Sequence, residues 1–296
     1  MEPASQRTVK FAPAVFAGYR KVREAGGVDV ALVLVTGGSG MLGSALLPRL
    51  AGAGYRVRAT TRSSAGRDGE GAIEWIGVDW VTGAGLVEAL DGVDVVIHAV
   101  NSAGRDSRQV NVAGLARLLE AAERAGVRHL LYPSIVGIEA VPYAYYKHKV
   151  EAEGLVAATR VPWSIVRATQ FHGFVDMVLR RLARLPVMVL YARALLQPVD
   201  VGEVAARLVE QIAAGPTGDI SSFAGPQILT LGAVAEGWRR ASGTRKRAVN
   251  VPLPGRIGRA LRAGALTDSG APHGERCWQE WLATAYSGGS ETQRAP

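Results

Sequence analysis

The fold is decided by one stretch near the start of the chain, 30-VALVLVTGGSGMLG-43. Its first half, Val30 to Thr36, is an unbroken apolar and β-branched run, typical of a strand buried on both faces of a parallel sheet. Gly37, Gly40 and Gly43 follow at intervals of three residues, and the segment from Met41 to Ala53 has the apolar spacing of a helix. We therefore predict a strand, a tight glycine turn and a helix in direct succession.

This turn has the chemistry of a dinucleotide-phosphate site. Glycines let the chain turn tightly, admit a pyrophosphate close to backbone N–H groups, and pack the helix against the strand without a Cβ. The start of the helix supplies further N–H donors and a positive potential to the phosphates. We predict that Gly37, Gly40, Met41, Leu42 and Gly43 bind a dinucleotide. The alternative is a glycine turn with a purely structural role.

Strands and helices alternate along the first part of the chain. Strands are expected at 30–36, 55–60, 73–78, 93–100, 128–133 and 163–167, and helices at 41–53, 86–90, 110–125 and 143–158. Pro48 is the one residue that disagrees with its helix. This alternation predicts an α/β fold with a doubly wound parallel sheet of the Rossmann type, right-handed crossovers, and helices on both faces.

Beyond Thr169 the pattern loosens. Helices are expected at 175–185, 202–213, 231–241 and 275–285, and short strands at 197–199 and 220–223. We predict an N-terminal extension over residues 1–29 and a dinucleotide-binding core over 30–170. A smaller substrate lobe is expected over 171–296, interleaved with the last core elements.

The end of the second strand predicts which cofactor is preferred. A site for NAD usually has Asp or Glu there, which accepts a hydrogen bond from the ribose 2′-hydroxyl. This chain has Thr60-Thr61-Arg62-Ser63-Ser64, with no carboxylate. Arg62 can pair with a 2′-phosphate, and Ser63 and Ser64 can add hydroxyl donors. We therefore predict NADP(H) in preference to NAD(H), the alternative being an ordinary solvated arginine.

Two further segments follow the ends of predicted strands. Asp79 comes after the third strand, where its carboxylate either accepts a hydrogen bond from the adenine amino group or caps a turn. Ala99, Val100 and Asn101 come after the fourth strand, where small residues leave room for the ribose and nicotinamide. We predict cofactor contacts at all four positions, although Asn101 is also a residue that begins loops.

The run Tyr143-Ala144-Tyr145-Tyr146-Lys147-His148-Lys149 contains two overlapping pairs of Tyr and Lys, each four residues apart. This spacing puts both side chains of a pair on one helix face. A neighbouring ammonium and the positive nicotinamide of the cofactor would stabilise phenolate and lower the pKa of the phenol from its ordinary value near 10, and the lysine can hold ribose hydroxyls. The alternative is an exposed helix start rich in aromatic and basic residues. The face of Tyr145 and Lys149 continues through apolar residues, so we predict that this pair faces the sheet and that Tyr143 and Lys147 face away.

With these residues in hand, the chain resembles the short-chain dehydrogenase/reductase superfamily, and most closely its atypical, NmrA-like branch of NAD(P)H-binding oxidoreductases. The resemblance covers roughly residues 30–215. It rests on the glycine turn, on Tyr145 and Lys149, and on the run Val161-Pro162-Trp163-Ser164-Ile165-Val166-Arg167-Ala168-Thr169-Gln170-Phe171. It implies that Thr169 and Phe171 lie beside nicotinamide. It also implies a catalytic hydroxyl just past the fifth strand, where Ser134 is the hydroxyl present, at or one position before the usual place.

The residues and the resemblance together predict an NADPH-dependent oxidoreductase that reduces a carbonyl or related unsaturated small molecule, with Tyr145 as proton donor. Phe171, His172 and Phe174 are expected to line the substrate pocket. His172 is either an alternative proton donor, because its ordinary pKa is near neutral, or a plain loop histidine. Since the branch includes proteins that bind cofactor without catalysis, the alternative function is an NADP(H)-binding regulator, redox sensor or scaffold.

Composition argues against several other classes. The net charge is +8, but the basic residues are scattered along the chain, so no nucleic-acid partner is expected. The single cysteine, Cys277, and five separated histidines show no metal-ligand spacing, so no metal is expected. No apolar run approaches the roughly 20 residues that span a bilayer, so we predict a cytoplasmic protein without a membrane partner. The oligomeric state is left open.

Overall fold

The computed structural model describes residues 21–22, 28–62 and 73–287. Its centre is a seven-stranded sheet in which every neighbouring pair of strands is parallel. In order across the sheet, the strands are β11 (Ile220–Phe223), β8 (Trp163–Ala168), β7 (His129–Ile135), β6 (Val95–His98), β3 (Leu32–Thr36), β4 (Arg56–Thr61) and β5 (Ile73–Gly77). The predicted Rossmann-type sheet is confirmed.

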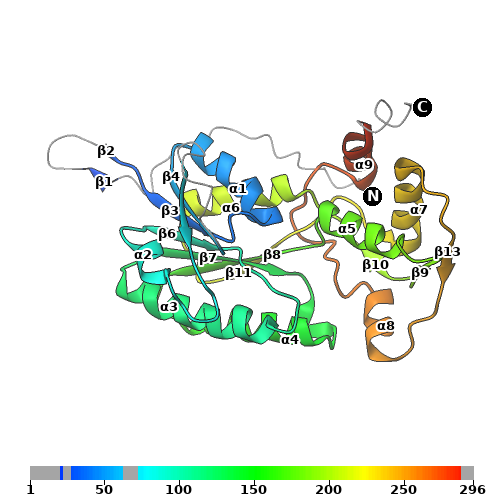
Figure 1. The fold of residues 1–296 in the computed structure, drawn as a ribbon, viewed down its shortest axis with the longest axis horizontal. Helices are drawn as coiled ribbons and strands as arrows, with labels where there is room; N and C mark the ends of the chain where they lie inside the picture. The colour runs from blue at the N-terminus through cyan, green and yellow to red at the C-terminus, as the bar shows by residue number, and fades with distance from the viewer. Residues whose placement is uncertain (1–20, 23–27, 63–72, 288–296) are drawn as a thin grey trace, which may run out of the picture.

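Helices cover both faces of this sheet (Figure 1). On one face α1 (Met41–Gly52) and α6 (Val201–Ala214) pack against side chains of β3, β6 and β8. On the other face lie α2 (Leu86–Leu90), α3 (Leu115–Arg124) and α4 (Ala144–Ala158). The strand order reverses at β3, which pairs with β4 on one side and β6 on the other. Ligands of open α/β sheets bind beyond the carboxyl ends of the strands at such a reversal.

Two of the predicted helices differ in detail from the helices in the structure. The helix expected at 110–125 begins as a π-turn, η1 (Gln109–Gly114), before α3, because apolar periodicity does not distinguish a widened first turn from an α-helical one. Pro48 stands inside α1 without ending it. Its ring is exposed, while Leu42, Leu46 and Leu50 of the same helix are buried against the sheet, and this packing outweighs the lost hydrogen bond.

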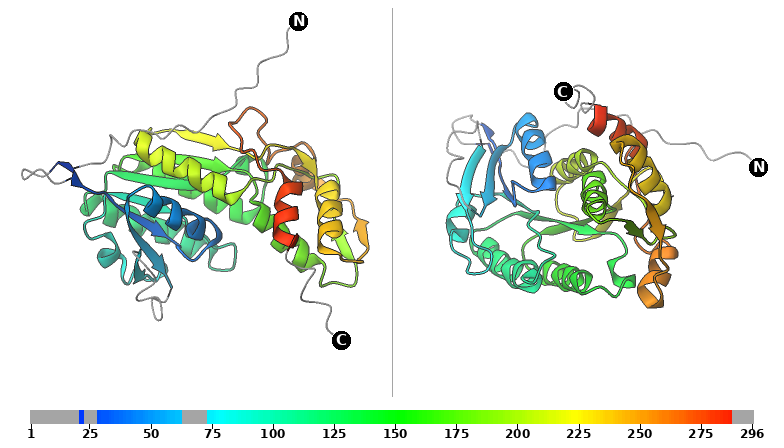
Figure 2. Two further views of the ribbon diagram at one scale, coloured as in Figure 1. Left: turned by 90° about the horizontal axis from the view of Figure 1, so that it is seen from above. Right: turned by 45° about the vertical axis from the view of Figure 1, so that its right-hand side comes forward.

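The C-terminal lobe has its own core, built on Leu179, Met188, Trp238, Trp278 and Leu282. Its elements are α5 (His172–Leu182), β9 (Met188–Leu190), β10 (Leu195–Leu196), β12 (Leu229–Thr230), α7 (Leu231–Ser242), β13 (Ala248–Asn250), α8 (Gly255–Arg262) and α9 (Trp278–Tyr286). Figure 2 shows this lobe at one end of the sheet. α6 and β11, from the same half of the sequence, belong to the central sheet and its helix layer.

Three smaller elements complete the described chain: the antiparallel pair β1 (Lys21–Val22) and β2 (Val28–Asp29), and the 3-10 turn η2 (Ile138–Ala140) after β7. β9 and β13 were not predicted, because three-residue strands have no periodicity to detect. α8 was not predicted either, because Gly258 is its one buried residue and it presents no apolar stripe to the core. Among the described residues, no helix has both the length and the apolar character to cross a membrane.

Candidate functional site

The glycine turn joins β3 to α1, and two of its glycines, Gly38 and Gly43, are packed too closely against their neighbours to admit a side chain. Gly37 has a φ of 68°, in the left-handed region that favours glycine, and its carbonyl accepts a hydrogen bond from the Gly40 N–H at 2.9 Å. A Cβ on Gly43 would lie 2.2 Å from the Gly37 carbonyl oxygen, so only glycine lets the helix approach the turn. Gly38 is similarly enclosed, since a Cβ there would lie 2.8 Å from that of Ala59.

The first turn of α1 is suited to an anion. Gly40 is its N-cap and provides no side-chain hydrogen bond, and the first turn has no acidic residue. The N–H groups that begin a helix have no partner within it, and their positive end favours phosphate. Met41 is exposed at this position. The close glycine packing and the uncapped helix start fit the pyrophosphate of a dinucleotide.

The two residues predicted on the adenosine side have different surroundings. Arg62, directly after β4, is exposed. Asp79 Oδ1 accepts hydrogen bonds from the backbone N–H groups of Val81 at 2.8 Å and Thr82 at 3.3 Å, which lower the pKa of this carboxyl. Asp79 Oδ1 therefore caps a turn, and contact of this carboxylate with the adenine amino group stays a prediction. Ser63 and Ser64 lie outside the described residues.

The segment after β6 connects the glycine turn to α4. Val100 packs against Gly37, whose Cβ position would be 3.1 Å from Val100 Cγ2, and Ala99 packs at the edge of the core. The next residue, Asn101, donates a hydrogen bond from Nδ2 to the Tyr145 hydroxyl at 2.6 Å. Two predicted site residues from distant parts of the sequence are thus in direct contact at the carboxyl edge of the sheet.

Helix α4 has the orientation that its apolar face predicted. Tyr145 and Lys149 are buried, while Tyr143 and Lys147 are exposed. Burial raises the pKa of the Tyr145 phenol, only partly opposed by the hydrogen bond from Asn101. Without the nicotinamide, which is also expected to lower this pKa, the cost of burying a phenolate dominates.

The Lys149 ammonium is directed at Tyr132 of β7. Its Nζ donates to the Tyr132 hydroxyl at 2.7 Å and to the Pro133 carbonyl at 3.1 Å, and it lies 4.1 Å from the centre of the Tyr132 ring. Burial lowers the pKa of Lys149 to about 7, although the nearby Glu153 carboxylate opposes that shift. An ammonium has three N–H donors, so one donor remains for a ligand after these two bonds.

Tyr132 belongs to a buried polar group that the sequence did not reveal. Its ring stacks on that of His98, with centroids 6.0 Å apart, and His98 Nδ1 lies 2.9 Å from Thr36 Oγ1. Burial, reinforced by the Lys149 charge, lowers the pKa of His98 to about 3. His98 and Tyr132 sit in apolar strand runs and resemble ordinary core residues in sequence. The one available signal was a polar ring near the carboxyl end of each strand.

A second group of hydrogen-bonded residues that the sequence did not predict attaches the loop after β6 to α4. The buried Asn111 of the π-turn donates to the Ser102 carbonyl at 2.6 Å and to Ser107 Oγ at 3.1 Å. Ser107 Oγ in turn lies 3.0 Å from His148 Nδ1. These hydrogen bonds position the segment that contains Asn101 beside Tyr145.

Ser134 lies on the same face of the sheet as Tyr132, because alternate residues of a strand share a face. That face is covered by α4, whose Ala152 and Val156 pack in the same core as Tyr132. Within the described residues, the buried Ser134 Oγ has no hydrogen-bond partner. An unpartnered buried hydroxyl on the side that holds Tyr145 fits a contact with a ligand.

The residues predicted on the substrate side do not share one environment. Thr169 is buried, and its Oγ1 accepts a hydrogen bond from Gly225 N–H at 3.0 Å. Phe171 is half-buried against the core on the α1 side, and Phe174 is exposed. α5 begins at His172. Because successive residues of a helix point about 100° apart, the side chains of His172 and Phe174 point to different sides of α5.

His172 requires a correction. It is not a loop residue, because α5 begins at His172, and its fully buried ring lies 5.6 Å from that of Trp278 and 5.8 Å from that of Trp281. Burial lowers its pKa to about 4, so it is neutral at physiological pH and unsuited to donating a proton. The next residue, Gly173, does adjoin the glycine turn, since a Cβ there would be 3.2 Å from the Met41 side chain.

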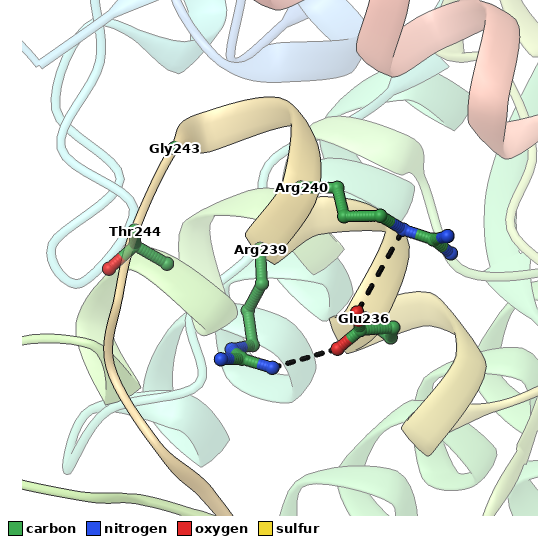
Figure 3. Close-up of a pocket in the computed structure, with 5 residues that line it drawn as sticks. All are labelled: Glu236, Arg239, Arg240, Gly243 and Thr244. Carbon is green, nitrogen blue, oxygen red and sulfur yellow. Dashed lines mark hydrogen bonds and ion pairs between the residues drawn. The ribbon is translucent and has the colours of Figure 1, made fainter.

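A shallow hollow elsewhere has no features of a cofactor site. It is lined by Glu236, Arg239, Arg240, Gly243 and Thr244 at the end of α7 (Figure 3). Both guanidinium groups pair with Glu236, at 2.8 Å for Arg239 and 3.9 Å for Arg240. None of these residues was predicted to bind a ligand.

The sequence has reductases among its relatives. It is 30% identical over 214 residues, 67% of this chain and 70% of the relative, to a (4-alkanoyl-5-oxo-2,5-dihydrofuran-3-yl)methyl phosphate reductase of Streptomyces griseus. A ceramide reductase of Caulobacter vibrioides is 29% identical over 80% of this chain and 78% of its own length. The match to uncharacterized mycobacterial proteins, 29% identical over 157 residues, covers 53% of this chain but 17% of the relatives' length.

The fold has close structural neighbours. An NADPH-dependent quinone oxidoreductase of Escherichia coli, solved with NADPH, superposes with a TM-score of 0.71 at 19% identity, over 86% of this chain and 99% of that one. The sequence profile of a family described as NAD(P)H-binding matches residues 37–173, which include the glycine turn, Tyr145 and Lys149. The chain therefore belongs to the NAD(P)H-binding, atypical short-chain dehydrogenase/reductase superfamily.

Proposed function

We propose that the protein is an NADPH-dependent oxidoreductase that reduces a carbonyl or a related unsaturated small molecule. The observation that carries the proposal is the contact of Tyr145 with Asn101 at 2.6 Å, one helical turn before the buried Lys149. Family membership supports cofactor binding, and the two reductases among the relatives support reduction as the chemistry. NADPH, when bound, supplies the hydride.

Tyr145 is the proposed proton donor. The reduction of a carbonyl places negative charge on its oxygen, and a positioned acid must then deliver a proton. Because burial raises the pKa of Tyr145, the phenol stays protonated at neutral pH, which is the form that a donor requires. The Asn101 amide fixes the phenol oxygen by donating to it, which leaves the phenol hydrogen for the substrate.

Ser134 and Lys149 have supporting roles in this proposal. Ser134 Oγ, without a partner among the described residues, would donate a hydrogen bond to the substrate oxygen. The remaining N–H of Lys149 would hold the nicotinamide ribose hydroxyls. Tyr132 and the Pro133 carbonyl limit the movement of the ammonium by accepting its other two hydrogen bonds.

The preference for NADP(H) rests on Arg62. Its exposed guanidinium follows β4, where a superfamily member selective for NAD would have a carboxylate. A guanidinium can make two parallel hydrogen bonds to the 2′-phosphate. The ribose 2′-hydroxyl of NAD would lack that interaction.

A cofactor-binding regulator is the second candidate. The observation that favours it is the direction of the Lys149 ammonium, which bonds to Tyr132 and Pro133, while burial raises the pKa of Tyr145. A sensor needs the cofactor site alone. It has no need for a tyrosine poised to donate a proton.

The experiment compares Tyr145→Phe with Tyr143→Phe. Wild-type protein is first tested for NADPH oxidation against ketones and quinones. A positioned general acid contributes about 10²–10⁴-fold to a rate, so Tyr145→Phe should slow turnover on that scale with little change in NADPH affinity. Tyr143→Phe should behave as wild type, since Tyr143 is exposed.

Other outcomes have defined meanings. A larger loss in Tyr143→Phe would show that the other tyrosine is the donor. Wild-type activity in both variants would exclude proton donation by Tyr145 and by Tyr143. NADPH binding without turnover of any ketone or quinone would favour the regulator.

A further inference from the structure

The C-terminal lobe has an exposed aliphatic surface on its two-stranded sheet. β9 and β13 run parallel, with Val189 paired to Val249. Met188 and Leu190 of β9 are buried in the core of the lobe. Because alternate residues of a strand point to opposite faces, Val189 points outward.

Five side chains form this outer surface in two adjacent rows, and we call them the aliphatic face. They are Val187, Val189, Val249, Val251 and Leu253. All five are between 36% and 48% exposed. Isolated exposed valines are common on soluble proteins, but a contiguous group marks a contact surface.

The charged residues in the segments that carry the aliphatic face are all basic. The segments 181–193 and 244–262, which contain β9, β13 and α8, have no Asp or Glu. They contain nine basic residues, Arg181, Arg184, Arg193, Arg245, Lys246, Arg247, Arg256, Arg259 and Arg262. All except Lys246, which is half-buried, are exposed. We call these nine residues the basic rim, since the segments that carry the aliphatic face contain no acidic residue to neutralise them.

Helix α8 is held beside the strands and brings three of these arginines with it. A Cβ on Gly258 would lie 1.7 Å from the Leu253 carbonyl oxygen, so the first turn of α8 packs closely on the residues just before it. The Tyr191 hydroxyl, just after β9, donates to the Gly258 carbonyl at 3.1 Å. Arg256, Arg259 and Arg262 are spaced three apart, so each lies beside the next on the surface of the helix.

We propose that the aliphatic face and its basic rim bind the surface of an anionic lipid bilayer. Aliphatic side chains enter the boundary between headgroups and acyl chains, and arginines pair with anionic headgroups. Such peripheral contact needs no spanning helix, so it departs from the expectation of no membrane partner without requiring a transmembrane segment. β9, β13 and α8 lie at the end of the molecule opposite α2, where a flat surface can approach them (Figure 1).

Charge and composition favour this occupant over two others. A second copy would bring two cationic rims together, which repel each other. Single-stranded nucleic acid stacks its bases on aromatic side chains, whereas the five side chains of the face are aliphatic. An anionic bilayer offers an apolar region to the aliphatic face and anionic headgroups to the basic rim.

The test is co-sedimentation of the full chain with vesicles. We expect binding to phosphatidylcholine vesicles that contain phosphatidylserine, weakening as salt screens the arginines, and little binding to phosphatidylcholine alone. Arg259→Gln should weaken binding about fivefold, the effect of one basic residue near an anionic surface. The double variant Val189→Asn with Val249→Asn should weaken it further, and thermal unfolding verifies that each variant is folded.

Matched controls lie at the other end of the molecule. Val87→Asn changes a valine that is 81% exposed on α2, and Arg124→Gln removes an exposed arginine on α3. Both should bind vesicles as wild type does. Absence of binding to the phosphatidylserine vesicles, equal binding to both compositions, or an equal loss in Val87→Asn would overturn the proposal. So would a dimer that the double variant dissociates and that binds no vesicles, which would assign the face to a second copy.

Discussion

The pKa of Lys149 makes folding stability depend on pH in a way that one substitution can isolate. Burial lowers this pKa from its ordinary value of 10.5 to about 7. Between those values the unfolded chain binds a proton at Lys149 that the folded chain has lost. The free energy of unfolding must therefore rise with pH through that window. Lys149→Met removes the titrating group while keeping a side chain of similar length.

The magnitude follows from the linkage between proton binding and stability. Integrating the difference in bound protons from about pH 7 to about pH 9, at about 1.4 kcal/mol per proton per pH unit, gives roughly 2 kcal/mol from Lys149. Chemical denaturation of both proteins at several pH values measures this, because every other titrating group contributes nearly equally to each. Wild type should gain about 2 kcal/mol more than Lys149→Met over this range.

Lys147→Met is the control, since Lys147 is exposed on the same helix. Its pH profile should match that of wild type. Parallel profiles for wild type and Lys149→Met would refute the reasoning, because they would mean that Lys149 keeps an ordinary pKa when folded. In that case the bonds to Tyr132 and Pro133, together with the Glu153 carboxylate, would offset the whole cost of burying the ammonium.

The remaining predictions use the same comparative design. Arg62→Ala should weaken NADPH binding by about 1–3 kcal/mol in a fluorescence titration and leave NADH binding unchanged. Arg56→Ala, at the other end of β4, should leave the binding of both cofactors unchanged. Gly43→Ala should abolish NADPH binding or unfold the protein, since its Cβ would overlap the Gly37 carbonyl; binding at wild-type affinity would contradict the turn geometry. Because burial lowers the pKa of His172 to about 4, the unfolded chain binds its proton first on acidification. From about pH 7 to about pH 5, His172→Phe should lose about 2 kcal/mol less stability than wild type, and an equal loss would contradict this.

The sequence alone determined the central sheet and its turn. The apolar run before Gly37 and the alternation of strand and helix are local signals, each readable within a few residues. The burial of Tyr145 and Lys149 was also predictable, because a helix face is set by spacing along one segment. The glycine positions followed from the same local geometry, since only glycine allows the close approach of α1 to the turn.

Only the tertiary structure decided what these side chains contact. Lys149 bonds to Tyr132 because α4 crosses β7, and no spacing along α4 encodes that partner. His172 is buried because α9, from the far end of the chain, lays Trp278 and Trp281 against it. The aliphatic face exists because two short strands pair at Val189 and Val249. Contacts between distant segments depend on how whole elements pack, and local periodicity has no information about that packing.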